Sequence, residues 1–489
     1  MTKPIEIMDI TIRDAQQCLW ATRMRADEMT AIARTMERAN FFIVDLMGGA
    51  MMDTAIMHMR EDPFERLRMM RKLMPNTRIN FNSRGQSSFR WRQYADDVLD
   101  FTFGVMHKNG CNSVLVIDAI NDFRNIRSSV KFCKDRDMYV IGGVTYTISP
   151  VHTDQFFVDK TKEIVALGVD AVEIKDPSGL LTPERAKALV PAMKRAAGPG
   201  IQVQLHTHCT YGHGIDVYEA AMDLPEEDRP DLFHGAADPL GWGYSLPPHR
   251  EILRAAAERG LDVAVNGVEI NEIEDYFHCV TQQSGRPPGK RIRPQPLTDH
   301  QVPGGMMSNL EQMLADQGHA DRLPEVLEEV ARVRHDLGYP IMVSPLAQYV
   351  GTQAVFNVIT GERYQVVPEE IRQYVLGWYG QLVAPVDPVA RELIAGDTEA
   401  ITVPPGELLE PEMEAFEREH GPFDSDEDMC LAMFYAPETL RSYRQARVNT
   451  RNTALPTSAI SYLMHSLTGR SDLELVEVSR PGISLSTSF

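Results

Sequence analysis

Two histidines separated by one residue, His206 and His208, are the clearest chemical signal in the sequence. In a β-strand, residues i and i+2 point to the same face, so both imidazoles can reach one metal ion. Imidazole nitrogen is among the commonest metal ligands in proteins. Two packed core histidines would give the same local pattern, so the pair alone does not establish a metal site.

The segment AVEIKDPSGLLTP, residues 171–183, places Lys175 at the inner end of an apolar strand. A buried ammonium is costly, and burial lowers the pKa of an amine. A neutral amine can react with CO2 to give an anionic carbamate, whose oxygen can bind a metal. The alternative is an ordinary ion pair between Lys175 and either Asp176 or Glu173. Because successive strand residues point to opposite faces, Asp176 is the less suitable partner.

Short apolar strands alternate with amphipathic helices over residues 6–236. Eight strands are predicted: Glu6–Ile10, Phe42–Leu46, Arg78–Asn82, Val114–Asp118, Tyr139–Thr145, Ala171–Lys175, Gln202–His206 and Leu232–Ala236. Eight strand–helix repeats predict an α/β fold, a parallel TIM (β/α)8 barrel. An open doubly wound sheet is the alternative, but the first strand lacks the glycine-rich loop of a dinucleotide-binding fold.

In such a barrel, functional residues lie at the carboxyl ends of the strands. Charged and polar residues follow nearly every predicted strand there. They are Arg13-Asp14, Asp45, Asp53, Asn82-Ser83-Arg84, Asp118, Lys175-Asp176 and His206-Thr207-His208. One such residue could be a solvated loop or a helix cap, but the whole set predicts a catalytic mouth. Asp14 follows the first strand, which closes the barrel near the seventh and eighth, so it can join the two histidines.

The composition is that of an ordinary globular protein, with 43% hydrophobic and 24% charged residues. The 69 acidic side chains outnumber the 49 basic ones, and a net charge of −20 disfavours a nucleic-acid binder. The six cysteines form no CxxC pair, which is typical of a reducing compartment. No apolar run reaches the ~18 residues of a membrane span, and the N-terminus lacks a signal-peptide core, so we expect a cytoplasmic protein.

Several motifs occur in the order found in biotin-dependent carboxyltransferases. DITIRDAQQCLWATRMR, residues 9–25, resembles the DTTxRDAHQSLxATRxR opening of that family. The resemblance continues through MGGAMMD, EDPFERL, SRG, DAIND, YTISPVHT, KDPSGLLTP, HTH and VPGGMMSNL, and extends more loosely to residue 447. The family includes pyruvate carboxylase, oxaloacetate decarboxylase alpha subunits and the transcarboxylase 5S subunit.

The resemblance implies a role for each residue of the mouth. The ligands of a divalent metal, either zinc or, as alternatives, cobalt or manganese, would be Asp14, His206, His208 and a carbamylated Lys175. The catalytic residues would be Ser308, Arg84, Arg13, Gln17 and Asp118. Arg84 would bind the carboxylate of a 2-oxo acid. The other substrate-binding residues would be Gln17, Asp53, Trp91 and, as the loosest match, Asp231.

The resemblance also implies the reaction. A carboxybiotin arm would enter the mouth and release CO2 in a water-poor pocket. Ser308 would relay a proton from the acceptor to the biotin nitrogen, and an enolate stabilised by the metal and the arginines would attack CO2. The expected partners are a biotin carboxyl carrier protein and a biotin carboxylase subunit, because the sequence contains neither a biotinylation site nor an ATP-dependent carboxylase region.

The walls of the mouth depart from the family pattern, whereas the ligand set is retained. Met47 stands where tryptophan is usual, and Trp91 stands where tyrosine is usual. Cys209-Thr210-Tyr211-Gly212 and the loop Asp238–Tyr244 replace segments of small residues. These changes leave the acceptor open between pyruvate, another 2-oxo acid and a related carbonyl compound.

At 489 residues the chain is too long for one ordinary domain. We predict a barrel over residues 1–300, a mainly α-helical domain over 301–447 and a polar tail over 448–489. The helical domain carries Ser308 after the turn Pro303-Gly304-Gly305. It resembles the family's dimerisation lobe, and apolar stripes at Ile371–Leu376 and Leu382 support a homodimer.

Two other functions share part of the pattern. Metal-dependent Claisen lyases and synthases, such as HMG-CoA lyase, have the barrel, the aspartate and the HxH pair. They lack the lysine ligand and the PGG segment, so Lys175 and Ser308 distinguish the two groups. The second alternative is a non-catalytic scaffold subunit of a carboxylase complex, and the complete ligand set argues against it.

Overall fold

The computed structural model describes residues 3–90, 92–316, 318–453, 475–480 and 483–488. Eight parallel strands form a closed barrel in chain order, and β1 pairs with β8 at the seam. The strands are β1 (Glu6–Asp9), β2 (Ile43–Gly48), β3 (Arg78–Ser83), β4 (Ser113–Ile117), β5 (Tyr139–Thr145), β6 (Ala171–Asp176), β7 (Gln202–Thr207) and β8 (Leu232–Gly235). The predicted barrel is confirmed.

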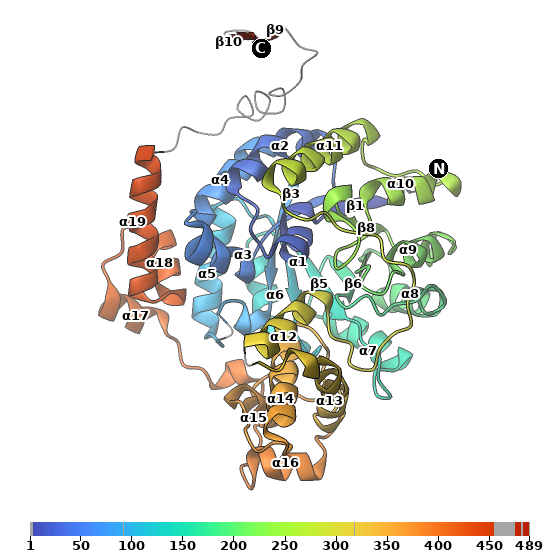
Figure 1. Ribbon diagram of the computed structural model, residues 1–489, viewed down its shortest axis with the longest axis vertical. Coiled ribbons are helices and arrows are strands. Elements are labelled where there is room, and N and C mark those ends of the chain that lie inside the picture. The colour runs from blue at the N-terminus through green and yellow to red at the C-terminus, as the bar shows by residue number, and fades with distance from the viewer. Residues whose placement is uncertain (1–2, 91, 317, 454–474, 481–482, 489) are drawn as a thin grey trace.

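Helices surround the barrel in the alternation that the sequence predicts (Figure 1). They are α2 (Ala26–Arg38), α4 (Pro63–Leu73), α5 (Asp96–Lys108), α6 (Arg127–Lys134), α7 (Asp154–Val165), α8 (Pro183–Ala197), α9 (Gly214–Met222), α10 (His249–Glu258) and α11 (Gly267–Ser284). Local signals set where several of them begin. Asp62 accepts the N–H groups of Phe64 and Glu65 at the start of α4, and Thr182 caps α8 ahead of Pro183.

A helical lobe lies below the barrel in Figure 1 and has its own apolar core. It consists of α12 (Gly304–Asp316), α13 (Leu323–Asp336), α14 (Leu346–Thr360), α15 (Glu369–Val375) and α16 (Pro388–Ala395). The lobe contacts the loops that follow β4 and β5. Gln381 donates its N–H to Asp122 Oδ2 over 2.8 Å, and Arg334 donates to Thr147 Oγ1 over 3.0 Å and to the Ile148 carbonyl over 2.8 Å. It therefore covers part of the mouth.

The last helices belong to the barrel rather than to this lobe. They are α17 (Met413–His420), α18 (Asp426–Phe434) and α19 (Pro437–Thr453). Phe434 stacks on Phe89 of the barrel with ring centroids 4.3 Å apart, and Tyr435 joins the same core. The region predicted as one helical domain, residues 301–447, thus divides in two. Within the predicted tail, α19 runs to Thr453 and β9 (Leu475–Arg480) pairs antiparallel with β10 (Ile483–Ser488).

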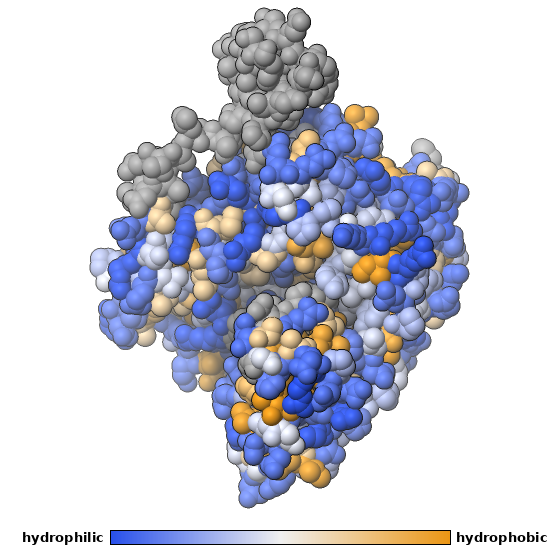
Figure 2. Space-filling model, in the orientation of Figure 1, coloured by the Kyte–Doolittle hydropathy of each residue, from blue (hydrophilic) through white to orange (hydrophobic). Residues whose placement is uncertain are grey.

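The apolar stripe that supported a dimer is used inside the lobe. Ile371 is 1% exposed and Val375 4% exposed, because both pack into the lobe core. This face of the molecule is mostly hydrophilic, with hydrophobic residues gathered over the lobe (Figure 2). On α16, Val389 is 69% exposed and Leu393 52% exposed. Among the described helices, none combines the length and the apolar character that a membrane crossing requires.

Candidate active site

Three predicted metal ligands meet at the carboxyl ends of β1 and β7. Asp14 lies in a π-turn, η1 (Thr11–Ala15), directly after β1. Its Oδ2 is 3.4 Å from His206 Nε2 and 3.7 Å from His208 Nε2, and the two Nε2 atoms are 3.1 Å apart. All three side chains are buried. One carboxylate and two imidazoles with converging ligand atoms are a donor set that suits a divalent transition metal.

The charges in this cluster reinforce one another. Burial alone would raise the pKa of Asp14, but Arg13 and the two histidines hold it well below its usual range. Burial disfavours the charged form of His208, yet hydrogen bonds to Asp14 and Cys18 raise its pKa to about 10. His208 Nδ1 lies 2.7 Å from the carbonyl of Tyr244, so this nitrogen donates and Nε2 faces the cluster. Burial and the nearby Lys175 lower the pKa of His206 well below its usual value, so His206 is neutral.

Lys175 lies beside the cluster and forms an ion pair with Glu173. Lys175 is the register partner of His206 on the neighbouring strand. Its Nζ donates to Glu173 Oε1 over 2.9 Å, and both side chains are buried. Asp176 faces the other way and accepts the N–H groups of Leu180 and Leu181 at 2.9 and 2.8 Å. Of the two partners left open by the sequence, the structure selects Glu173.

Arg13 is held at the mouth by two carboxylates. Its Nε donates to Asp45 Oδ2 over 2.6 Å, and its Nη1 is 3.4 Å from Asp14 Oδ1. The other oxygen of Asp45 accepts from the side-chain amides of Asn80 and Asn82 at 2.9 and 2.6 Å. This arrangement orients a buried guanidinium next to the metal-type cluster and leaves its charge balanced.

Arg84 follows β3 and lies between the barrel and the lobe. Burial lowers its pKa to about 10, although Asp53 and Tyr349 oppose the shift, so the guanidinium is charged at neutral pH. Arg84, Asp118 and Tyr379 line one small cavity. Asp118 Oδ1 accepts the N–H groups of Ile120 and Asp122 at 3.0 and 2.8 Å. Asp118 therefore shapes the loop opposite Arg84, and burial raises its pKa to about 6.

The other predicted residues are distributed around the mouth. Asp53 lies on α3 (Gly49–Thr54) and accepts from the Tyr435 hydroxyl over 2.9 Å. Gln17 is exposed on α1 (Gln16–Trp20), and α12 packs against this helix. Ser308 belongs to α12, but its side chain lies outside the described residues, as does Trp91.

Comparisons with known proteins agree with this geometry. Residues 4–224 match the HMGL-like family, and residues 297–475 match the conserved carboxylase domain. A pyruvate carboxylase subunit of Methanothermobacter thermautotrophicus is 37% identical over 90% of this chain and 78% of its own length. The 5S subunit of methylmalonyl-CoA carboxyltransferase of Propionibacterium freudenreichii subsp. shermanii is 35% identical over 85% of this chain and 82% of its own.

Among solved structures, the carboxyl transferase domain of Rhizobium etli pyruvate carboxylase aligns with a TM-score of 0.84 at 25% identity. The alignment covers 99% of this chain and 83% of that one. The chain belongs to the biotin-dependent carboxyltransferase family. The resemblance inferred from the motifs is thus confirmed, and the chain is an enzyme. The carboxylase-domain match covers the segment with Ser308, which is the region that distinguishes carboxyltransferases from Claisen lyases.

One predicted substrate-binding residue of the carboxyltransferase lies at the wrong end of the barrel. Asp231 precedes β8, so it belongs to the amino ends of the strands, opposite the mouth. There it accepts the N–H of Val203 over 2.8 Å and forms ion pairs with Lys194 and Lys3. The prediction for Asp231 is wrong because a family match at a loop position did not take the direction of the strand into account.

Sequence reasoning missed the polar residues behind the metal-type cluster. His234 Nδ1 is 3.0 Å from His206 Nδ1, and His234 Nε2 is 3.1 Å from Gln204 Oε1. Burial and the nearby Lys175 lower the pKa of His234 well below its usual value, so this ring is neutral too. The segment QVQLHTH, residues 202–208, carried a signal, because every second residue is polar. Barrel interiors are normally filled by branched apolar residues, so such a strand face is unusual.

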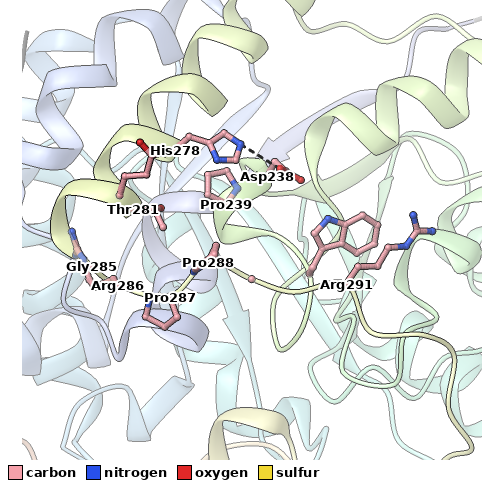
Figure 3. A pocket seen from close by; sticks show the side chains of 12 residues that line it. Asp238, Pro239, His278, Thr281, Gly285, Arg286, Pro287, Pro288 and Arg291 are labelled. Atoms are coloured by element: carbon pink, nitrogen blue, oxygen red, sulfur yellow. Dashed lines mark ion pairs between the residues drawn. The ribbon is translucent and has the colours of Figure 1, made fainter. Parts of the chain in front are cut away.

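A second cavity, of about 680 Å³, opens beside the site. Figure 3 shows it between η5 (Asp238–Leu240), α11 and residues 285–291. Asp238 and His278 pair across it at 3.4 Å, and the Arg291 guanidinium lies 4.7 Å from the Trp242 ring centroid. Trp242 and Tyr244, whose carbonyl accepts from His208, share one loop, so this cleft adjoins the metal-type cluster.

Proposed function

We propose that the chain moves CO2 between carboxybiotin on a separate carrier protein and the enolate of a 2-oxo acid, pyruvate or oxaloacetate in the first instance. The observation that carries this proposal is the buried cluster of Asp14, His206 and His208 beside two buried arginines. Cations arranged before reaction stabilise a developing oxyanion without reorganisation, which is what enolate formation requires.

The donor set fits a divalent metal, and we propose zinc, with cobalt or manganese as alternatives. Asp14 would supply a carboxylate oxygen, and His206 and His208 would each supply Nε2. Lys175 would be the fourth ligand as a carbamate, formed by CO2 after its amine leaves Glu173. A divalent ion bound there supplies Lewis-acid polarisation of the acceptor's 2-oxo oxygen.

Arg84 would bind the carboxylate of the acceptor. Its guanidinium is charged and buried, and a charged hydrogen bond is stronger in a site of low dielectric constant. Gln17 and Asp53 would border the same pocket, and Arg13 would add positive charge near the reacting carbonyl. The pocket then selects an anion with a carbonyl next to its carboxylate.

Ser308 would carry the proton. CO2 leaves carboxybiotin, the Ser308 hydroxyl gives its proton to the biotin nitrogen and takes one from carbon 3 of the acceptor, and the enolate attacks CO2. The lobe that carries α12 covers part of the mouth, which favours exclusion of water from CO2. Asp118 would act indirectly, by holding the loop opposite Arg84.

The proposed partners are a biotin carboxyl carrier protein and a biotin carboxylase subunit. The chain's relatives include separate carboxyltransferase subunits, which supports a carrier acting in trans. The helical lobe is the proposed dimerisation element of a homodimer.

One experiment tests the proposal. The purified chain, loaded with metal, is incubated with a carboxylated biotin carrier and a panel of 2-oxo acids, and carboxyl transfer is followed together with the metal content. We expect transfer to at least one 2-oxo acid and about one metal per chain, with most of the metal lost in His206→Ala. Transfer to none of them by the metal-loaded wild type would contradict the proposed reaction, and a wild-type metal content in His206→Ala would contradict the ligand assignment.

A further inference from the structure

A line of hydrogen-bonded side chains crosses the interior of the barrel and ends at the metal-type cluster. It is formed by Tyr139 on β5, by Gln202, Gln204 and His206 on β7, and by His234 on β8. The three β7 residues alternate along the strand, so they share its inward face. Gln204 is 0% exposed, and His206 and His234 are each 1% exposed. Water therefore offers these groups no substitute partner.

Each link in this line is within hydrogen-bond distance. The Tyr139 hydroxyl donates to Gln202 Oε1 over 2.9 Å, and Gln204 Nε2 donates to the same oxygen over 2.8 Å. Gln204 Oε1 then lies 3.1 Å from His234 Nε2. His234 Nδ1 lies 3.0 Å from His206 Nδ1. The line ends at His206 Nε2, which is 3.1 Å from His208 Nε2.

The direction of these bonds follows from what each atom can do. An amide oxygen only accepts, so the oxygen of Gln204 requires the proton of His234 on Nε2. A neutral imidazole has one N–H, so His234 Nδ1 is an acceptor and His206 Nδ1 must donate to it. His206 Nε2 then keeps its lone pair and points toward Asp14 and His208. Glu173 Oε1, 3.5 Å from His206 Nδ1, favours the same proton position.

We propose that His234 and Gln204 are positioning residues, which hold His206 in the tautomer and orientation that present its Nε2 lone pair to the metal. This inference rests on the metal centre of the proposed function. Partners of this kind orient a ligand histidine and commonly change metal affinity by about 10- to 100-fold. Here the partner is a second histidine, itself fixed by a glutamine two residues before the ligand on the same strand.

The test is a matched pair of variants at position 234. Asn and Leu have nearly the same shape, but only the Asn oxygen can accept the His206 Nδ1 proton in place of His234 Nδ1. The measurement is the dissociation constant of zinc for each metal-stripped protein, in bicarbonate buffer at one pH. We expect His234→Asn to stay within about threefold of wild type and His234→Leu to weaken binding by about 10- to 100-fold.

A second pair, Gln204→Glu and Gln204→Met, carries the same comparison one link further away and serves if His234→Leu does not fold. Glutamate can still accept from His234 Nε2, whereas methionine cannot serve as an equivalent acceptor. Nitrogen-15 spectra of the imidazoles supply a readout that packing alone would not move. In the metal-free wild type, His206 should carry its proton on Nδ1, and this preference should be lost in His234→Leu.

The outcomes separate the two levels of the argument. A wild-type protein that binds no zinc contradicts the metal centre itself. Zinc binding by the wild type together with equal affinities for the Asn and Leu variants, or a His206 proton found on Nε2 in the metal-free wild type, overturns the positioning role alone.

Discussion

The ion pair between Lys175 and Glu173 should show strong energetic coupling in the metal-free protein. The two charged atoms are 2.9 Å apart, and the side chains are 9% and 0% exposed. The perturbations are Lys175→Met, Glu173→Gln and the double variant. Each single change leaves one buried group without its partner, whereas the double change leaves two neutral side chains of similar size.

The expected magnitude follows from distance and burial. At an effective dielectric constant near 20, unit charges at this separation attract by about 6 kcal/mol, before desolvation is subtracted. Removing one member of a buried pair costs about 3–5 kcal/mol of stability, while replacing both members is often close to neutral. We therefore expect each single variant to lose about 3 kcal/mol or more, and the double variant to lose clearly less than the sum.

The assay is urea denaturation with chelator present, which gives the free energy of unfolding of all four proteins in a double-mutant cycle. The exposed pair Lys131–Asp135, with side chains 68% and 55% exposed, is the control and should couple by less than about 1 kcal/mol. Additive losses at Lys175 and Glu173 would refute the reasoning, because they would mean that the two groups do not interact in solution. Strong coupling would mean that formation of a lysine carbamate must first disrupt this pair.

Three further predictions concern the metal site and the assembly. Lys175→Arg should abolish carboxyl transfer, because a guanidinium cannot form the carbamate, and Lys175→Ala should be partly restored by a small carboxylate; activity retained in the arginine variant would contradict the carbamate. Zinc affinity should rise by up to about tenfold per pH unit between pH 7 and 9, because the pKa of His208 is raised to about 10 and the metal must displace its proton; an affinity independent of pH in isothermal titrations would be inconsistent with this. Light scattering at micromolar concentration should show a homodimer, and a monomer would be inconsistent with the proposed lobe contact.

The barrel and the two histidines were predictable because their signals are local. Alternation of strands and helices follows from bond geometry, and the observed strands begin and end within two residues of the predicted ones. The i, i+2 spacing of His206 and His208 fixes a shared direction in any strand. Closure of the barrel then brings Asp14 to them, since β1 must neighbour β8.

The rest depended on which elements pack together. An apolar stripe such as Ile371–Leu376 says that a face is covered, but only tertiary packing determines that the lobe's own core covers it. Asp231 falls at the far end of the barrel because the chain enters β8 there.

The sequence by itself determined the fold, the family and most of the residues at the mouth, because local periodicity and ordered motifs carry that information. Only the tertiary structure decided the partners of those residues. Lys175 has acidic neighbours at two sequence positions, and the strand face it shares with Glu173 selects one of them. The contact between His206 and His234 joins residues 28 positions apart, and it exists because closing the barrel faces β7 and β8 toward the same interior. Side chains that meet across strands are set by three-dimensional closure, which no local pattern encodes.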